Sequence, residues 1–419
     1  MIGYIGAQIV GIYVYKEWGV RMKEVNHKKQ MYAYWLNSLP GIGSKTIRRL
    51  MSIYEDPEAF YQRMKTAGKC VPSEAGTEGS KILTLKQETV IKEHIKQWDV
   101  SGEYDKLLKA DIRFLTMDDV EYPKHLKEIP DPPFGIFVKG RIPSDKLISV
   151  AVVGARECSE YGKYMAKELG NTLGSRGIQV ISGMARGIDG ISQMAALEAG
   201  GTSFGVLGCG VDICYPAGNQ ALYRRLIKEG GILASYPPGT QPQASLFPPR
   251  NRIVSGLADV VVVVEARQKS GTLITVDMAL EQGREVYCVP GRLTDRLSDG
   301  CNKLIRQGAG IVLSPEDLLD ELANLYPDRA YWSLKKAKKV DNSNNDMIME
   351  QLGEGMEARI LEQLDFTPKS IEQIRAGIIP APSYAETQQI LMRLTLASVA
   401  GQASPGYFVK KYLYEKLDC

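Results

Sequence analysis

The residues best suited to chemistry in this sequence lie between Phe247 and Gly283. A run of valines ending at Val264 has no polar member and predicts a buried strand. The loop Lys269-Ser270-Gly271-Thr272 follows, before a helix expected from about Leu273. A loop of small and hydroxyl residues between a strand and a helix exposes backbone N–H groups at the positive end of the helix dipole. This stretch therefore predicts a phosphate site.

Positive charge is expected around this loop. The basic cluster Arg250-Asn251-Arg252 precedes the strand, and Lys269 opens the loop itself. Three cations beside unpaired N–H groups favour a polyanion or a nucleotide as the ligand. Phe247 stands before two prolines in an expected loop, where an exposed ring could stack on a base; the alternative is a ring buried beneath the loop. Cationic loops beside an aromatic ring suit a single strand better than a duplex, because unstacked bases offer their faces.

The elements that must position these residues form an α/β pattern over residues 148–320. Short Val- and Ile-rich runs predict strands at 148–153, 179–181, 203–207, 231–234, 259–264 and 285–289. Helical stretches separate them, at 159–174, 188–199, 218–229, 272–282 and 300–307. Strands that are apolar on both faces predict a parallel sheet covered by helices on either side, and such sheets bind ligands beyond the carboxyl ends of the strands.

Glycine-rich turns occupy those strand ends. Gly154 and Arg156 follow the first strand, and Gly183 and Arg186 follow the second. Because the carboxyl ends of parallel strands share one edge, we expect these turns to meet the 269–272 loop on a single rim. Arginine forks there could engage a phosphate with two hydrogen bonds; the alternative for each is a surface ion pair.

Catalytic groups are scarce on this rim. The three histidines, His27, His94 and His125, all lie outside the α/β region. Asp189 is expected to cap the helix that follows it, and Glu265 is expected to pair with Arg250 or Arg252. No GxGxxG turn opens the first strand–helix unit, and no Walker A lysine loop is present. The sequence thus favours a binding protein over an enzyme, with no cofactor and no metal ion.

Composition sets the broad class. A chain of 419 residues exceeds one core, and 44% hydrophobic with 24% charged residues is typical of a globular protein. The net charge is only +3, so nucleic-acid binding must come from a local patch. The seven cysteines form no CxxC pair, which favours reduced thiols in the cytoplasm without a disulfide framework. The apolar residues 1–15 are too short to span a bilayer. An uncleaved anchor, an extra strand and upstream sequence ahead of a later start are the alternatives for them; the last is favoured, and no membrane association is expected.

Six regions are expected along the chain. Residues 1–30 are an uncertain extension, since Met22 and Met31 are also plausible starts. A helical domain follows, in which the turn Pro40 to Gly43 is of helix-hairpin-helix or small-bundle type and Ser44 is expected to cap the next helix. The regions are an N-terminal extension (1–30), a helical SAM-like domain (31–110), a bridge with a possible strand at 136–138 (111–147), the α/β domain (148–326), a polar linker (327–353) and a winged-helix-like domain (354–419).

The expected recognition helix of the last region, ETQQILMRLTLAS, carries one arginine and no lysine. Major-groove recognition usually needs more cations and polar groups along that helix. A protein-contact role is therefore favoured for the terminal region.

Several phrases, in a fixed order, resemble the DNA-processing protein A (DprA/Smf) family: VGAREC, VISGMARGIDGIS, VLGCGVDICYP, FPPRNRIVSGLADVVVVVEARQKSGTLIT, GREVYCVPG and GCNKLIRQGA. The resemblance implies an extended Rossmann-like domain that binds single-stranded DNA. It also implies protection of incoming DNA, loading of the RecA recombinase during natural transformation, and a homodimer. By motif, Arg156 and the 269–272 loop would hold phosphates, Phe247 would contact a base, and Arg250-Asn251-Arg252 would form a basic turn.

The sequence departs from the family pattern at three places. Gln193 stands where the family has a histidine, and Tyr236 where it has a glutamate. A lysine common before the aromatic residue is missing from 241–245, and losing one cation should flatten the salt dependence by about 0.7 per phosphate contact.

Two other functions remain open. Phosphoribohydrolases of the same fold class carry a glutamate after the glycine-threonine turn, where this chain has Leu273-Ile274-Thr275. A sensor of a nucleotide-derived signal would also bind phosphate, but without a dependence on strand length. Release of free base from nucleoside monophosphates would favour the enzyme, and tight binding of a mononucleotide would favour the sensor.

Overall fold

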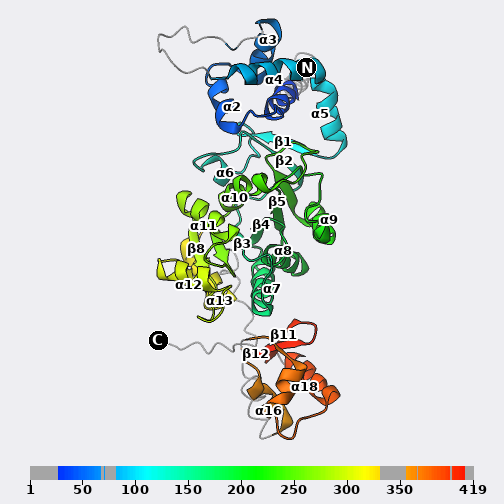
Figure 1. The fold of residues 1–419 in the computed structure, drawn as a ribbon, viewed down its shortest axis with the longest axis vertical. Helices are drawn as coiled ribbons and strands as arrows, with labels where there is room; N and C mark the ends of the chain where they lie inside the picture. Colours follow the sequence, from blue (N-terminus) through cyan, green and yellow to red (C-terminus); the bar gives the residue numbers. More distant parts are fainter. Residues whose placement is uncertain are drawn as a thin grey trace, which may run out of the picture.

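A computed structural model of the protein describes residues 27–67, 70, 82–330, 355–365, 367–396 and 399–410. These residues form three units along the longest axis: helices at one end, an α/β unit in the middle, and a small terminal unit at the other end (Figure 1). The expected extension up to residue 26, and most of the expected linker, lie outside the described residues. No described helix has both the length and the apolar character needed to cross a membrane.

The middle unit is built on one nine-stranded sheet with the order β1-β2-β6-β5-β4-β3-β7-β8-β9. Neighbouring strands from β6 to β9 run parallel, whereas β1 pairs with β2 and β2 with β6 antiparallel. The strands are β1 (Arg113–Thr116), β2 (Gly135–Gly140), β3 (Ser149–Val153), β4 (Gln179–Ser182), β5 (Ser203–Val206), β6 (Gly231–Ala234), β7 (Val260–Val263), β8 (Glu285–Cys288) and β9 (Gly310–Ile311). The six strands predicted from sequence are β3 to β8, so the α/β class is confirmed and the sheet is mixed rather than purely parallel.

Helices cover both faces of this sheet. They are α7 (Glu160–Ser175), α8 (Ile188–Glu198), α9 (Gln220–Glu229), α10 (Phe247–Gly256), α11 (Gly271–Glu281), α12 (Asp299–Arg306) and α13 (Pro315–Leu325). The five predicted helices correspond to α7, α8, α9, α11 and α12, with ends shifted by about two residues or fewer. Strands such as β3 and β7 are buried at every position, as expected for strands covered on both sides.

Helix α10 corrects the expectation of a loop and a basic turn at residues 247–252. Pro248 and Pro249 lie in its first turn, where a missing N–H costs no intrahelical hydrogen bond. Arg250, Ile253 and Val254 are buried at helical spacing and form the inner face of α10. The two prolines therefore begin the helix rather than extend the loop.

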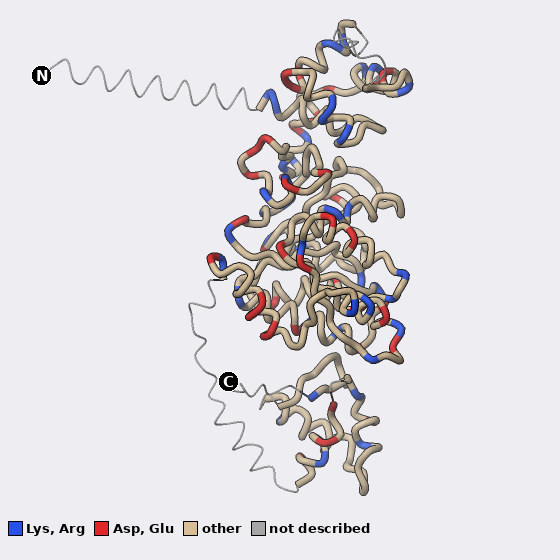
Figure 2. The backbone as a smooth tube through the Cα atoms, turned by 90° about the vertical axis from the view of Figure 1, so that its left-hand side faces the viewer, with Lys and Arg blue, Asp and Glu red and all other residues tan. Residues whose placement is uncertain are grey.

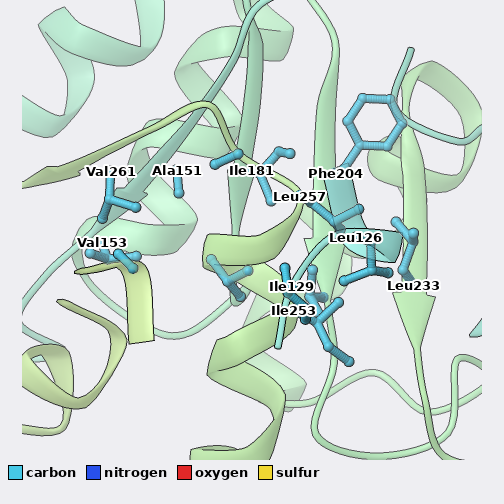
Figure 3. Packing of buried hydrophobic residues seen from close by; sticks show 14 of the residues in the cluster. Leu126, Ile129, Ala151, Val153, Ile181, Phe204, Leu233, Ile253, Leu257 and Val261 are labelled. Atoms are coloured by element: carbon cyan, nitrogen blue, oxygen red, sulfur yellow. The ribbon is translucent and has the colours of Figure 1, made fainter. Parts of the chain in front are cut away.

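The region expected as a bridge belongs to the same folded unit. It contains the two antiparallel strands β1 and β2, and the short helix α6 (Lys124–Lys127). Figure 3 shows Leu126 and Ile129 of this region near Ile253 of α10 and Leu257 just after it, beside Phe204 and Leu233 of the sheet. These contacts fix α10 on the sheet, and thereby fix the residues that α10 carries to the rim.

The N-terminal unit is helical, as predicted. A helix over 27–37 is followed by α2 (Ser44–Met51), α3 (Pro57–Ala67), α4 (Leu85–Gln97) and α5 (Val100–Lys109), which surround a core containing Trp35 and Phe60. The expectation that Ser44 caps α2 is wrong: Gly43 is the N-cap residue, and Ser44 Oγ accepts a hydrogen bond from the N–H of Phe134 at 3.2 Å. Ser44 instead ties this unit to the chain that leads into β2.

The terminal unit contains α16 (Met356–Gln363), α17 (Ile371–Ala376) and α18 (Tyr384–Leu396), with the strands β10 (Lys369–Ser370), β11 (Ala400–Ser404) and β12 (Tyr407–Lys410). The strands form a small antiparallel sheet in the order β10-β12-β11. Its assignment as a winged helix stays a prediction. Ser404 Oγ donates a hydrogen bond to a carboxylate oxygen of Glu160 at 2.7 Å, so this unit contacts the start of α7.

Candidate nucleic-acid interface

A cavity of about 750 Å³ lies where the loops after β3, β4 and β7 meet α10 and the start of α11. This volume falls within the usual range for ligand sites, about 300–1,000 Å³. Its lining includes most of the residues expected on the rim: Gly154, Arg156, Gly183, Arg186, Phe247, Arg250, Asn251, Ser270, Gly271 and Thr272. The convergence predicted from the glycine-rich turns is therefore present in the fold.

The first turn of α11 forms one wall of this cavity. The helix begins at Gly271, earlier than expected, and Ser270 is its N-cap residue. The side chain of Ser270 makes no capping bond, and its Oγ is buried without a hydrogen-bond partner among the described residues. Thr272 Oγ1 donates to the carbonyl oxygen of Gly154 at 3.2 Å, which ties this turn to the end of β3. The wall thus offers an unused hydroxyl at the positive end of a helix.

The glycines at the strand ends permit a close approach of the backbone. A Cβ on Gly154 would stand 2.6 Å from Cγ1 of Ile188, and one on Gly183 would stand 2.1 Å from a guanidinium nitrogen of Arg250. Both distances are shorter than any side chain tolerates. Gly187 has a φ of 75°, which favours glycine, at the entry to α8. These positions let the two loops fold closely around the cavity floor.

Arg250 is the floor of the cavity, not a mobile surface cation. Its side chain comes from the inner face of α10, is 5% exposed, and donates to the carbonyl oxygen of Val206 at 2.5 Å. Its Nε is buried without a partner among the described residues. Burial lowers the pKa of Arg250, and the nearby Asp189 carboxylate opposes that shift. Arg250 therefore contributes a fixed positive charge beneath the ligand space.

Asp189 supports this buried cation and does not cap α8, which corrects the expectation from sequence. Gly187 is the N-cap residue, and the Asp189 carboxylate accepts a hydrogen bond from the N–H of Gly183 at 3.1 Å. Burial raises the pKa of Asp189, while Arg250 and the surrounding donors lower it. Asp189 and Arg250 are thus both buried under the loop after β4, where the charge of each opposes the effect of burial on the pKa of the other.

Two predicted residues lie outside the cavity lining. Arg252 is two positions beyond Arg250, a rotation of about 200° around the helix, so its side chain faces away. Its guanidinium lies 3.5 Å from a carboxylate oxygen of Asp131. Lys269 is exposed in the loop just before Ser270, next to the cavity but not among its lining residues. The three cations expected together are therefore separate: Arg250 is buried under the cavity, Arg252 is near Asp131, and Lys269 is exposed beside the cavity.

The expected pairing of Glu265 with Arg250 or Arg252 is also wrong. Glu265 is buried and accepts hydrogen bonds from the N–H of Ser159, at 3.0 Å, and from its hydroxyl. Burial raises the pKa of Glu265, and the Ser159 donors oppose the shift. This carboxylate holds the start of α7 in place beside the rim.

Phe247 is half-buried inside a cluster rather than exposed at a loop. The guanidinium carbons of Arg156 and Arg250 lie over its ring, 5.7 and 5.9 Å from the centroid. Tyr215 stacks against the same ring, with centroids 5.4 Å apart and an interplanar angle of 29°. The sequence predicted either an exposed ring or a ring buried beneath the loop. The ring is instead partly exposed and packed against Tyr215, Arg156 and Arg250.

Among the lining residues that sequence reasoning did not name are an aromatic residue, Tyr215, and a further cation, Arg267. Arg267 is exposed in the loop that follows β7, and its nearness to Lys269 in sequence is the signal that could have identified it. Tyr215 comes from the loop between β5 and α9, for which no strand-end motif with a cation was present. With Arg156 and Arg186, also exposed, Arg267 gives the cavity a positive rim.

Two of the three departures from the family pattern, Gln193 and Tyr236, have structural roles here. Gln193 is fully buried; its side chain accepts from the N–H of Met184 at 3.1 Å and donates to the carbonyl oxygen of Phe204 at 3.0 Å. Tyr236 donates its hydroxyl to the carbonyl oxygen of Leu246 at 3.2 Å, just before α10. Both side chains hold segments that border the cavity.

The charge and chemistry of the lining suit an anion. Among the described residues, no cluster of histidine, cysteine or carboxylate groups could hold a metal ion. The carboxylates that line the cavity are Glu157 and Asp189, against the arginines of the rim and floor. Figure 2 shows acidic and basic residues interspersed along the described part of the tube, with no uniformly basic face in that view.

Comparisons with known proteins agree with this arrangement. The family model described as DNA recombination-mediator protein A matches residues 113–323. The DNA processing protein DprA of Streptococcus pneumoniae (strain ATCC BAA-255 / R6) is 43% identical over 208 residues, which cover 50% of this chain and 73% of that protein. The DNA processing protein DprA of Bacillus subtilis (strain 168) is 39% identical over 247 residues, covering 56% of this chain and 83% of that protein.

A solved structure has the same fold. The X-ray structure of DNA processing protein A from Streptococcus pneumoniae superposes with a TM-score of 0.59 at 34% identity, covering 70% of this chain and 97% of that one. The family match begins at β1 and ends in α13, so it includes the cavity and the two antiparallel strands. The chain therefore belongs to the DNA recombination-mediator protein A family.

Proposed function

We propose that this protein binds single-stranded DNA in the rim cavity, protects it, and delivers it to the RecA recombinase during natural transformation. The observation that carries the proposal is the meeting of three exposed arginines, a helix N-terminus and an aromatic pair in one cavity. The family membership supports a role in DNA recombination.

The phosphates of the strand are assigned to the loop around Ser270 and to the arginines. Arg156 and Arg186 lie on loops whose backbones are held close by glycines, and a guanidinium fork can bind phosphate through two hydrogen bonds. The N-terminus of α11 adds its dipole and the free hydroxyl of Ser270. A strand lying across these groups gains electrostatic affinity that does not depend on sequence.

Single-stranded DNA is favoured over a duplex because of the aromatic pair. Stacking on protein rings requires a base whose faces are free, and a duplex hides those faces. The half-buried ring of Phe247 and its neighbour Tyr215 lie within the same cavity as the arginines. Phosphate and base contacts are thus available to adjacent parts of one nucleotide chain.

A competition titration tests this proposal. A labelled single strand bound to the full chain should be displaced by an unlabelled single strand, with affinity that rises with strand length. Matched duplex and a mononucleotide should compete poorly. Fluorescence anisotropy reports each displacement. Displacement by the mononucleotide at equal concentration would instead favour the sensor of a nucleotide-derived signal.

The enzymatic alternative has a separate readout. A phosphoribohydrolase-like enzyme would release free base from nucleoside monophosphates, and chromatography of the incubated nucleotides detects it. The residues after Thr272 are Leu273, Ile274 and Thr275, with no carboxylate to contact a ribose. We therefore expect no release of base, and we propose that the protein acts without a catalytic step or a cofactor.

Delivery to RecA is tested by co-sedimentation. RecA, the protein and a long single strand are expected to form one sedimenting complex, whereas omission of the strand should leave less of this protein with RecA.

Natural transformation takes place in the cytoplasm once DNA has entered, and we propose that location for the protein.

A homodimer is proposed as the working unit, with the β9 edge of the sheet as the contact. β9 is the last strand in the sheet. Ile311, in this strand, is 42% exposed, and Leu313, two residues later, is 65% exposed. An exposed apolar edge strand is a template for pairing with another chain.

Replacing both Ile311 and Leu313 with glutamate should convert the dimer to a monomer. Two copies brought together at this edge would then place carboxylates against carboxylates and lose the buried apolar area. Light scattering coupled to size-exclusion chromatography measures the mass. The matched control places glutamate at Ile53 and Val120, which are also exposed but lie far from β9. The control should remain a dimer. A dimer that persists in the Ile311 and Leu313 variant contradicts the assignment.

A further inference from the structure

We propose that the terminal unit and single-stranded DNA compete for one surface at the end of the cavity. This shared surface consists of the first turn of α7, which begins at Glu160, and the loop 291–298. The inference rests on the proposed binding of single-stranded DNA and adds a competitor that belongs to the chain itself. The ligand chemistry is the sugar–phosphate backbone of a strand long enough to leave the cavity.

The terminal unit covers the shared surface and is held there by two side-chain hydrogen bonds. The carboxylate of Glu160 accepts from the hydroxyl of Ser404 at 2.7 Å, and the guanidinium of Arg292 donates to the hydroxyl of Thr367. β11 also packs against α7, and Figure 1 shows it beside the lower end of that helix. The unit is therefore attached to both parts of the shared surface.

The shared surface adjoins the cavity on both sides. Glu157, three residues ahead of the α7 carboxylate, lines the cavity, and so does Leu297, five residues after Arg292. The N–H of Ala266 donates to the carbonyl oxygen of Leu297 at 2.8 Å, which holds the loop next to Arg267 of the rim. A strand that fills the cavity and continues past Arg267 is thereby led onto the shared surface.

The loop of the shared surface suits a phosphate, whereas the terminal unit does not. Arg292 and Arg296 are exposed on this loop, and a guanidinium fork can bind phosphate through two hydrogen bonds. The described part of the terminal unit, in contrast, has no net charge, with five basic and five acidic residues. Its acidic residue Asp365 accepts a hydrogen bond from the N–H of Thr367 at 2.7 Å, which places a carboxylate near the hydroxyl that Arg292 contacts. A phosphate can take Arg292 only after the unit has left.

A contact of this small size is sufficient for a competitor within the same chain. A covalently attached unit has a high effective concentration at its docking surface, so weak contacts keep it docked for much of the time. The apparent affinity for a ligand that needs the undocked state falls in proportion to the undocked fraction. If about nine molecules in ten are docked, a long strand binds about tenfold more weakly than it would to a free surface.

The test releases the terminal unit without touching the cavity. Ser404→Glu places a second carboxylate beside Glu160, and like charges in contact should undock the unit. A strand of about 30 nucleotides should then bind about tenfold more tightly than to the parent, whereas one of about 5 nucleotides, which stays within the cavity, should bind equally to both proteins. Fluorescence anisotropy gives the affinities. Small-angle X-ray scattering without DNA should show a larger radius of gyration for the variant.

A second substitution keeps the result from being a simple effect of damage to the fold. Adding Glu160→Gln to Ser404→Glu removes the repulsion, and the amide can donate to the new carboxylate. The radius of gyration and the long-strand affinity should both return to the parent values. The matched control is Gln388→Glu, which adds the same charge at an exposed position of α18 and should bind both strands as the parent does.

Equal long-strand affinity in Ser404→Glu and the parent overturns the inference, and so does an unchanged radius of gyration. An equal gain for both strand lengths, or an equal gain in Gln388→Glu, also overturns it, because the effect would then not come from the shared surface. A parent protein that binds neither strand refutes the proposed function together with this inference. The other outcomes leave the proposed function intact, so the two failures are distinguishable.

Discussion

Replacing Arg250 with leucine should lower the free energy of unfolding by about 3–5 kcal/mol, because the change leaves Asp189 buried without its opposite charge. The carbonyl oxygen of Val206 also loses its donor. Asp189 keeps its hydrogen bond from Gly183, which does not compensate for a missing cation. Urea unfolding followed by circular dichroism measures the loss.

A double variant separates loss of charge from loss of packing. In Arg250→Leu with Asp189→Leu, no unpaired charge remains, so most of the stability should return, as is found when a buried ion pair is replaced as a whole. The comparison forms a double-mutant cycle, whose coupling term reports the interaction of the two residues. If the double variant is as unstable as the sum of the two single variants, the two side chains do not act as a couple.

Removing Arg156 and Arg186 together should weaken binding of single-stranded DNA by about 100-fold, since hydrogen bonds to charged groups contribute more than about 1.5 kcal/mol each. The slope of log affinity against log salt should also decrease by about 1.4, as two phosphate contacts are lost. Both side chains are exposed, so stability should change little. Anisotropy titrations at several salt concentrations give the affinity and the slope together.

The matched control removes the same charge elsewhere. Arg63, on α3, and Arg176, at the end of α7, are exposed and do not line the cavity. Their double replacement with alanine should leave the affinity near that of the parent. An equal decrease in both double variants would assign the binding to overall charge and not to the cavity.

Much of the α/β fold follows from the sequence because its strands are short, apolar on both faces and bounded by turns. β3 and β7, buried throughout, are of this kind. β1 was not predicted, because residues 113–116 gain their place from pairing with β2, a contact that no local pattern reveals. Helix α10 was missed since Pro248 and Pro249 indicate a loop unless the helix begins at that point.

The position of the site could be predicted, but the direction of each side chain could not. The glycine-rich turns located the rim because parallel strands end on one side of a sheet. Which of Arg250 and Arg252 faces the cavity depends on helical periodicity in α10, and that helix was not expected. The roles of Asp189 and Glu265 depend on burial and on distant donors, Gly183 and Ser159, which sequence spacing does not identify.

The two edges of the large sheet differ, and the difference bears on how many copies of the chain can associate edge to edge. At one end, helices of the N-terminal unit lie beyond β1 (Figure 1), and the ring of Tyr34 sits 5.9 Å from that of Phe114 and 5.7 Å from that of Phe137. At the other end, no described strand follows β9. A β-sheet with two exposed edges can pair with further molecules at both edges and extend into a fibre. A sheet with one exposed edge stops growing once that edge pairs with the same edge of a second copy. If the proposed dimer forms at the β9 edge, the helices of the N-terminal unit keep the β1 edge covered, and assembly stops at two copies.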